Sequence, residues 1–173
     1  MSFTLLFLVT LFLAYANGAN DNFKGVATLY GSQATTFRTA LIIGTVSTLA
    51  GSICSLFLAE ALVKAFSGKG LVPDEISMSS NFLLAVATGA ATTVFVTALV
   101  GLPISTTHAL IGALTGAGLI AAGAQVNFSM LGTKFVLPLL LSPLACILIT
   151  MPVYRLGQMV SARLGLKRKL SPY

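Results

Sequence analysis

Five long apolar runs determine what this chain can fold into. They cover residues 3–19, 39–66, 80–100, 107–123 and 134–154. Most are close to the roughly 20 residues that an α-helix needs to cross a bilayer. Inside lipid the backbone must satisfy its own hydrogen bonds, and a helix does so within one segment. We therefore expect an all-α, polytopic membrane helix bundle, a single transmembrane domain over residues 1–173 with a basic tail at 155–173.

The composition supports a membrane protein and argues against a nucleic-acid partner. Charged residues make up 8% of the chain, whereas a soluble domain usually carries about 25%. The net charge is +6, but no aromatic or fold signature of nucleic-acid binding accompanies it. The basic residues instead gather after the last apolar run, so we expect membrane lipid, and no nucleic acid, around this chain.

The positions of the basic residues predict an orientation. Lys and Arg beside a membrane helix usually mark its cytoplasmic side. The tail carries Arg155, Arg163, Lys167, Arg168 and Lys169. An odd number of crossings then puts the N-terminus outside, with seven of the ten basic residues inside. We expect a multi-pass protein of the cell membrane with a cytoplasmic C-terminal tail, although a re-entrant hairpin near Pro103 would change this path.

The first apolar run has a second interpretation, as a signal peptide. It is short, and Ala14-Tyr15-Ala16 resembles a cleavage site. However, no Lys or Arg precedes the run, and cleavage there would separate the polar stretch that follows from its helix. We favour a membrane helix that breaks near residues 17–20.

The first run leads into a polar stretch, Gly-Ala-Asn-Asp-Asn-Phe-Lys-Gly, at residues 18–25. Ionisable residues at membrane depth are rare and usually face a cavity or a partner. Asp21, the amides of Asn17 and Asn20, and carbonyls freed by a break offer the oxygen ligands that hard cations prefer. Asp21 also has two plainer interpretations, as a partner of Lys24 one turn on or as a solvated loop carboxylate. Our hypothesis is a monovalent cation site at Asp21.

A second polar stretch, residues 101–109, interrupts two later apolar runs. Pro103 has no backbone donor, so the preceding helix should end near it. Ser105 or Thr106 is then a suitable N-cap for the next helix. Free N–H groups beside three successive hydroxyls, ending at Thr107, favour an oxyanion site, whereas capping alone would use one hydroxyl. We expect the two polar stretches to converge on one solute site.

His108 is the single histidine of the chain. A histidine at this place is commonly a packing residue, and contact with the site or pH sensing is the functional alternative. No Ser and carboxylate arrangement would make it a catalytic base, so we do not expect an enzyme. No Cys or His cluster has metal-ligand spacing, so no metal is expected beyond the monovalent cation at Asp21.

Together the two polar stretches resemble the motifs of the inorganic phosphate transporter family. Gly-Ala-Asn-Asp at 18–21, followed by Thr28 and Gly31-Ser32, resembles the family signature, and residues 103–109 resemble its second motif. The resemblance covers most of this chain. A usual member has two homologous halves, and this chain corresponds to only one of them. It implies one inverted-repeat half of the family fold, with broken or re-entrant helices. The phosphate ligands that it suggests are Ser105, Thr106, Thr107, Thr28 and Ser32.

The resemblance also implies a function. Members place the solute near the bilayer midplane between two inverted halves, where broken helices aim dipoles at the anion. A symporter for inorganic phosphate follows, with a sodium ion or a proton as coupling ion and no other cofactor. This chain has Lys24 where members commonly carry Asn, and its ammonium would stand in for a cation, attract the anion or neutralise Asp21. That departure favours, as alternatives, proton coupling or a permease for sulfate or another oxyanion.

One half cannot close a two-sided site around an anion. We therefore expect a second half-transporter chain, homo- or heteromeric, or a longer parent protein. Opposed copies of one chain would have to insert in both directions, which the charge bias disfavours, so a separate partner chain is the preferred expectation. A non-transporting membrane accessory or scaffold protein is the remaining alternative.

Overall fold

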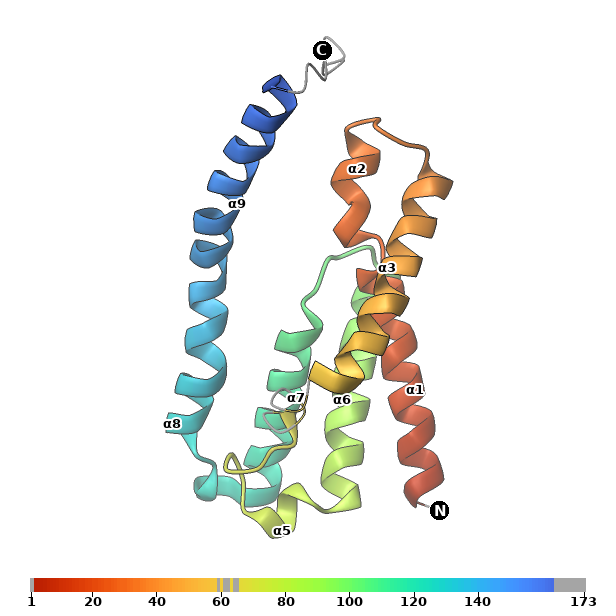
Figure 1. Cartoon of the computed structure of the whole chain (residues 1–173). Helices are drawn as coiled ribbons and strands as arrows, with labels where there is room; N and C mark the ends of the chain where they lie inside the picture. The colour runs from red at the N-terminus through yellow and green to blue at the C-terminus, as the bar shows by residue number, and fades with distance from the viewer. Residues whose placement is uncertain (1, 59, 61–62, 64–65, 164–173) are drawn as a thin grey trace. The chain divides into compact units, whose positions relative to one another are not determined.

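The computed structural model describes residues 2–58, 60, 63 and 66–163, and most of them are in helices (Figure 1). The first elements are α1 (Ser2–Asp21), η1 (Lys24–Val26), α2 (Ala27–Gly31), α3 (Phe37–Leu58), α5 (Asp74–Ser77), α6 (Ser80–Leu99) and α7 (Thr106–Ala122). They are followed by η2 (Gly123–Gln125), α8 (Phe128–Leu131), the π-helix η3 (Gly132–Val136) and α9 (Leu137–Arg163). The described residues form no β-strand, and the expected all-α class is confirmed.

Within the described part of the chain, five helical stretches are long and apolar enough to cross a membrane. They are Phe3–Gly31, Phe37–Leu58, Ser80–Leu99, Thr106–Gln125 and Phe128–Arg163. The first continues past its expected end through η1 and α2, and the last extends to Arg163 rather than ending at residue 154. Part of the expected second segment, at 59, 61–62 and 64–65, and the end of the basic tail, at 164–173, lie outside the described residues. The polytopic membrane bundle is confirmed.

The chain divides into two compact units, residues 1–128 and residues 129–173. In the second unit, η3 leads into α9, which contains Pro143 and Pro152. Each proline removes one intrahelical hydrogen bond, which membrane helices tolerate. The candidate site lies in the first unit.

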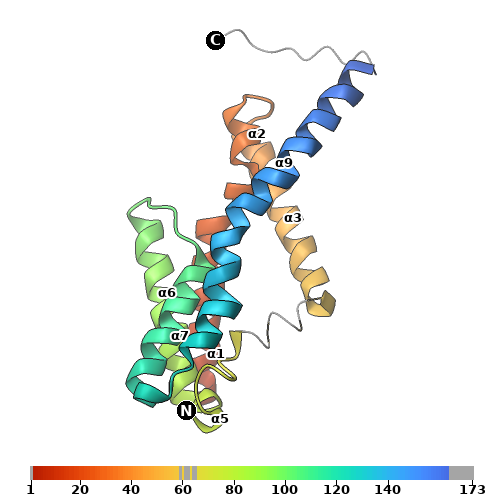
Figure 2. The ribbon, with the colours of Figure 1, turned by 90° about the vertical axis from the view of Figure 1, so that its left-hand side faces the viewer.

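The core of the first unit is made by α1, α6 and α7, which lie side by side (Figures 1 and 2). Helices α1 and α6 run in the same direction and α7 runs back against them. Ala16, Val94 and Ala109 are buried where the three helices meet. Small side chains such as those of the two alanines let membrane helices approach closely. The end of α1 therefore lies beside the turn that joins α6 to α7.

Helix α3 packs against the segment that follows α1. Its Gly44 permits this contact, because an added Cβ would lie 2.9 Å from the Asn22 carbonyl oxygen and 3.3 Å from Cγ2 of Val26. The Asn22 amide donates to the Thr45 hydroxyl at 3.0 Å and accepts from Thr48 at 3.1 Å. Thr48 lies near the middle of the 22-residue α3. The Asn22 side chain thus lies beside the interior of an apolar helix.

Three aromatic rings hold η1 and α2 against the start of α3. The Phe23 ring lies 5.2 Å from that of Phe37 and 5.9 Å from that of Tyr30, measured between centroids. Tyr30 and Phe37 complete the triangle at 5.7 Å. Aromatic pairs at these separations and tilts attract one another. They stabilise the return of the chain from α2 into α3.

Candidate functional site at two helix breaks

The first break follows α1. The Asn22 N–H still donates to the Gly18 carbonyl at 3.0 Å, and the chain then tightens into η1 at Lys24–Val26. Asn and Asp side chains compete with the helix for backbone hydrogen bonds, and residues 20–22 are Asn-Asp-Asn. Their side chains instead reach partners outside α1. The local sequence thus favours ending the α-helix where the polar groups begin.

The second break joins α6 to α7. Gly101 adopts a left-handed φ of 72°, which lets the chain leave α6. The Leu102 N–H donates to the Thr97 carbonyl at 2.9 Å, and Pro103 has no N–H to continue the helix. Ser105 then begins α7 as N-cap, its hydroxyl accepting from the His108 N–H at 3.3 Å. This agrees with the start predicted from the sequence.

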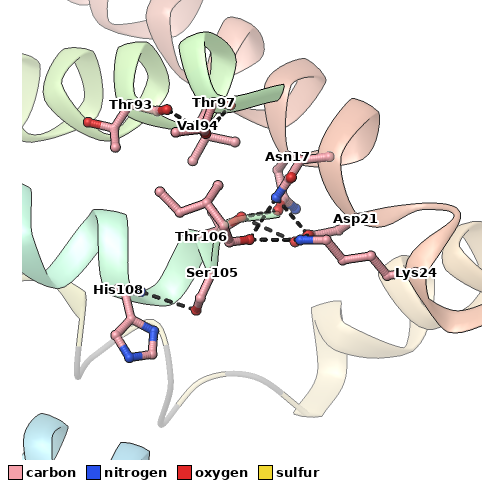
Figure 3. A network of polar contacts seen from close by, with 11 residues as sticks. Asn17, Asp21, Lys24, Thr93, Val94, Thr97, Ser105, Thr106 and His108 are labelled. Atoms are coloured by element: carbon pink, nitrogen blue, oxygen red, sulfur yellow. Dashed lines mark hydrogen bonds and ion pairs between the residues drawn. The ribbon is translucent and has the colours of Figure 1, made fainter. Parts of the chain in front are cut away.

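A network of polar contacts around Asp21 joins the two breaks (Figure 3). One carboxylate oxygen, Oδ1, accepts from the Asn20 amide at 2.8 Å and from the Lys24 ammonium at 2.7 Å. The other, Oδ2, accepts from the Thr106 hydroxyl at 3.1 Å. Asp21 therefore ties its own helix break to the first residue of α7.

The Ile104 carbonyl, freed by the second break, is the other centre of this network. The Asn20 amide donates to it at 2.9 Å and the Lys24 ammonium at 2.7 Å. Both donors therefore bridge Asp21 and Ile104. Contacts across 80 and 84 residues of sequence hold the two breaks together.

Several side-chain oxygen atoms lie close together around the Thr106 hydroxyl. The Thr106 hydroxyl lies 2.6 Å from Oδ1 of Asn17 and 3.1 Å from Oδ2 of Asp21. A hydroxyl has one proton, so it donates to one of these acceptors at a time. Amide, hydroxyl and carboxylate oxygens grouped in this way can bind a hard cation or a proton.

An open pocket of about 740 Å³ lies over this network. It is lined by Asn17, Asp21, Lys24, Phe66, Pro103, Ile104, Ser105, Thr106, Thr107 and Leu110. A smaller pocket of about 230 Å³ adjoins Asn20, and Lys24 lines both. Asp21 and Lys24 are the charged residues among those that line the larger pocket, and their charges cancel. Its wall is otherwise made of hydroxyls, an amide and apolar side chains.

Helix α7 presents backbone donors at this pocket. The Ser105 hydroxyl and carbonyl accept from the N–H groups of His108 and Ala109. The structure gives the N–H groups of Thr106 and Thr107 no partner among the described residues. Unpaired N–H groups in the first turn of a helix, with its positive dipole end, attract anions.

The other residues selected from the sequence lie apart from this network. Thr28 and Ser32 are exposed and do not line the pocket, and the Ser32 hydroxyl donates to the Leu29 carbonyl at 3.2 Å. The imidazole of His108 is exposed and points away from Asp21 (Figure 3). A direct role of these three side chains in the solute site, and pH sensing by His108, stay predictions.

Two contributions were not selected from the sequence. The first is Asn22, whose amide joins the break to Thr45 and Thr48 on α3. Thr45 and Thr48 lie about one helical turn apart within an apolar run. This spacing of two hydroxyls was the signal in the sequence that could have indicated a polar contact here. The second is the Ile104 carbonyl, since no side-chain pattern indicates which backbone oxygen a break exposes.

Comparison with known proteins decides the family. The model of the phosphate transporter family matches residues 17–171, which is most of the chain and includes both breaks. The chain belongs to the phosphate transporter family. The family resemblance inferred from the two motifs is thereby confirmed, and the chain is a multi-pass membrane protein.

Relatives within the phosphate transporter family are similar over most of this chain. A probable low-affinity inorganic phosphate transporter of Streptomyces halstedii is 37% identical over 142 residues, which cover 81% of this chain and 63% of that protein. A relative from Thermococcus kodakarensis, named as a candidate phosphate permease, is 32% identical over 76% of this chain and 32% of its own length. A Bacillus subtilis transporter with the same description as the Streptomyces protein is 27% identical over 90% of this chain and 46% of its own length.

The chain therefore spans between about a third and two thirds of these relatives. No solved structure matches it.

Proposed function

We propose that this chain is one half of a secondary transporter that moves inorganic phosphate across the cell membrane by cation symport. The observation that carries the proposal is the contact between the two breaks, where Asp21, Lys24 and Thr106 meet under one open pocket. The names of the family relatives support phosphate as the solute. Movement of the anion, not chemistry on it, is the proposed activity, so the chain is not an enzyme.

The proposed anion site is the start of α7. The N–H groups of Thr106 and Thr107, with the hydroxyls of Ser105 and Thr107, supply several hydrogen-bond donors on one side of the pocket. Phosphate oxygens are strong acceptors and carry the charge that a helix N-terminus favours. The Lys24 ammonium on the same wall adds a positive charge. An apolar solute would gain nothing from this arrangement.

The proposed coupling group is Asp21. A carboxylate that contacts both breaks can take up a proton, or share a cation with the oxygens of Asn17 and Thr106. Either event changes the net charge at Asp21, whose contacts join the two breaks. Binding of the cation and of the anion would thus depend on each other, which symport requires.

The second half of the site would come from a separate partner chain or from the rest of a longer protein. The half described here lines its pocket from one side, and the pocket is open. We propose that an inverted second half closes it, as in transporters built from inverted repeats. The excess of Lys and Arg after α9 supports a cytoplasmic C-terminus.

The proposal is tested by uptake of radiolabelled phosphate into membrane vesicles. Vesicles carry the chain alone or with a co-expressed second half, under a sodium gradient, a proton gradient or neither. Thr106→Val removes the hydroxyl that contacts Asn17 and Asp21 but preserves the shape of the side chain. Because a hydrogen bond to a charged group contributes about 1.5–3 kcal/mol, we expect uptake to fall roughly tenfold or more.

The matched control is Thr115→Val on the same helix. The Thr115 hydroxyl donates only within α7, to the Ile111 carbonyl at 2.7 Å, so uptake should stay near that of the wild type. Equal uptake in the two variants would contradict the proposed site. No uptake under any gradient, even with a second half, would favour an accessory or scaffold role. Stronger competition by sulfate than by unlabelled phosphate would identify a sulfate permease.

A further inference from the structure

The Lys24 ammonium occupies a position that a metal cation would otherwise suit. Its nitrogen lies 2.7 Å from Oδ1 of Asp21 and 2.7 Å from the Ile104 carbonyl oxygen. The first ligand is a carboxylate, and the second is a carbonyl released by a helix break. Transporters with broken helices hold sodium with oxygens of these two kinds. Here the converging oxygens already surround a positive charge that belongs to the chain.

The remaining donors at Asp21 leave little room for a second cation. Asn20 directs an amide N–H to Oδ1 at 2.8 Å, and Thr106 directs its hydroxyl to Oδ2 at 3.1 Å. Lys24 and Asn20 thus both point donors at Oδ1, while the Thr106 hydroxyl is shared between Oδ2 of Asp21 and Oδ1 of Asn17. A sodium ion at this place would have to displace the ammonium and turn these donors away.

A simple surface ion pair does not account for the geometry. An i, i+3 pair needs only its two charged ends, and the exposed pairs of this kind contribute little. The Lys24 nitrogen makes a second contact of equal length, with a carbonyl 80 residues away. That contact depends on the second break, so the ammonium is held at the junction of the two breaks.

We propose that Lys24 is a resident cation at this junction, so that phosphate binding to this chain does not require sodium. The part of this inference that concerns phosphate binding rests on the proposed function. The tethered ammonium supplies the positive charge that a bound sodium ion would bring. An ammonium has three donors, two of which are used by Asp21 and Ile104. The third is then available for an anion in the pocket that Lys24 lines.

The test compares sodium binding and phosphate binding in reconstituted wild-type and variant protein. Binding of radioactive sodium is measured without phosphate. Binding of radiolabelled phosphate is then measured in sodium chloride and in choline chloride at equal ionic strength. For the wild type we expect no saturable sodium binding and the same phosphate affinity in both salts, to within about twofold.

Lys24→Asn replaces the ammonium with a neutral side chain that carries an oxygen ligand. The site then keeps the negative charge of Asp21, and we expect saturable sodium binding. Phosphate should bind to this variant at least about tenfold more tightly in sodium chloride than in choline chloride. A tenfold difference corresponds to the loss of about one charged contact when sodium is absent. Lys24→Met removes the charge without supplying oxygen, so phosphate should bind weakly in both salts.

Lys69→Asn is the matched control, since Lys69 is exposed and lies outside both pockets. It should behave as the wild type in both assays. The elution profile in size-exclusion chromatography verifies that each variant is folded.

Saturable sodium binding by the wild type, with phosphate affinity that falls in choline, would overturn the inference. So would a Lys24→Asn variant that binds no sodium and keeps wild-type phosphate affinity, because Lys24 would then be a structural pair. If phosphate binds to no variant in either salt while Lys24→Asn still gains sodium, the proposed function fails and the resident cation stands.

Discussion

Replacing Asp21 with Asn is expected to lower phosphate uptake by about tenfold to a hundredfold. The carboxylate accepts from Asn20, Lys24 and Thr106, and it joins the first break to α7. An amide of the same shape has one acceptor oxygen and no charge, so it cannot serve all three donors. Each hydrogen bond to a charged group contributes about 1.5–3 kcal/mol, and about 1.4 kcal/mol corresponds to a factor of ten.

The measurement is the initial rate of radiolabelled phosphate uptake into vesicles with matched amounts of protein. Asp74→Asn is the control, because Asp74 is an exposed carboxylate in α5, away from both breaks. Its uptake should equal that of the wild type. Uptake by Asp21→Asn within about twofold of wild type would show that the junction does not depend on this charge.

Gly44→Ala is expected to destabilise the first unit and to disrupt the first break. The new Cβ would lie 2.9 Å from the backbone oxygen of Asn22, which cannot move without shifting the segment after α1. Overpacking of this kind costs about 1–3 kcal/mol. For a chain of this size each kcal/mol shifts the midpoint of thermal unfolding by about 2–4 °C. We expect a lower midpoint in detergent, together with reduced phosphate uptake.

Gly51→Ala provides the comparison on the same helix. Among the described residues, and apart from its chain neighbours and the backbone of its own helix, no atom lies within 4 Å of the Cβ that it adds. Since Ala favours a helix over Gly by about 1 kcal/mol, this variant should unfold at the same or a slightly higher temperature. If the two variants unfold at the same temperature, α3 does not pack against the break as described.

The fold class was predictable because hydropathy decides it. The apolar runs, the proline at 103 and the hydroxyl at Ser105 act locally, and the structure places helices and an N-cap where these signals indicate. Ends of segments were less predictable. The first run continues into η1 and α2 because small and apolar residues follow the polar stretch without a proline.

Some residues of the candidate site were predictable from the sequence, but its contacts were not. The sequence predicted that two polar stretches would converge, and the structure brings Asp21, Lys24 and Thr106 together. The Lys24 contact with the Ile104 carbonyl and the Asn22 contacts with α3 depend on tertiary packing. Propensities and spacings describe neighbours in sequence, and they do not say which distant backbone oxygen a side chain reaches.

The most direct test of the central claim, that the two breaks form one open phosphate pocket, is chemical labelling of Thr107→Cys. Thr107 is exposed and lines the pocket beside Thr106. Cys54 and Cys146 are both free and exposed, so they are first replaced with Ser. The rate of reaction with a charged thiol reagent is then measured with and without phosphate. We predict fast labelling that phosphate slows by at least about threefold and chloride does not. A cysteine that does not react, or that reacts at the same rate with phosphate present, would contradict the account.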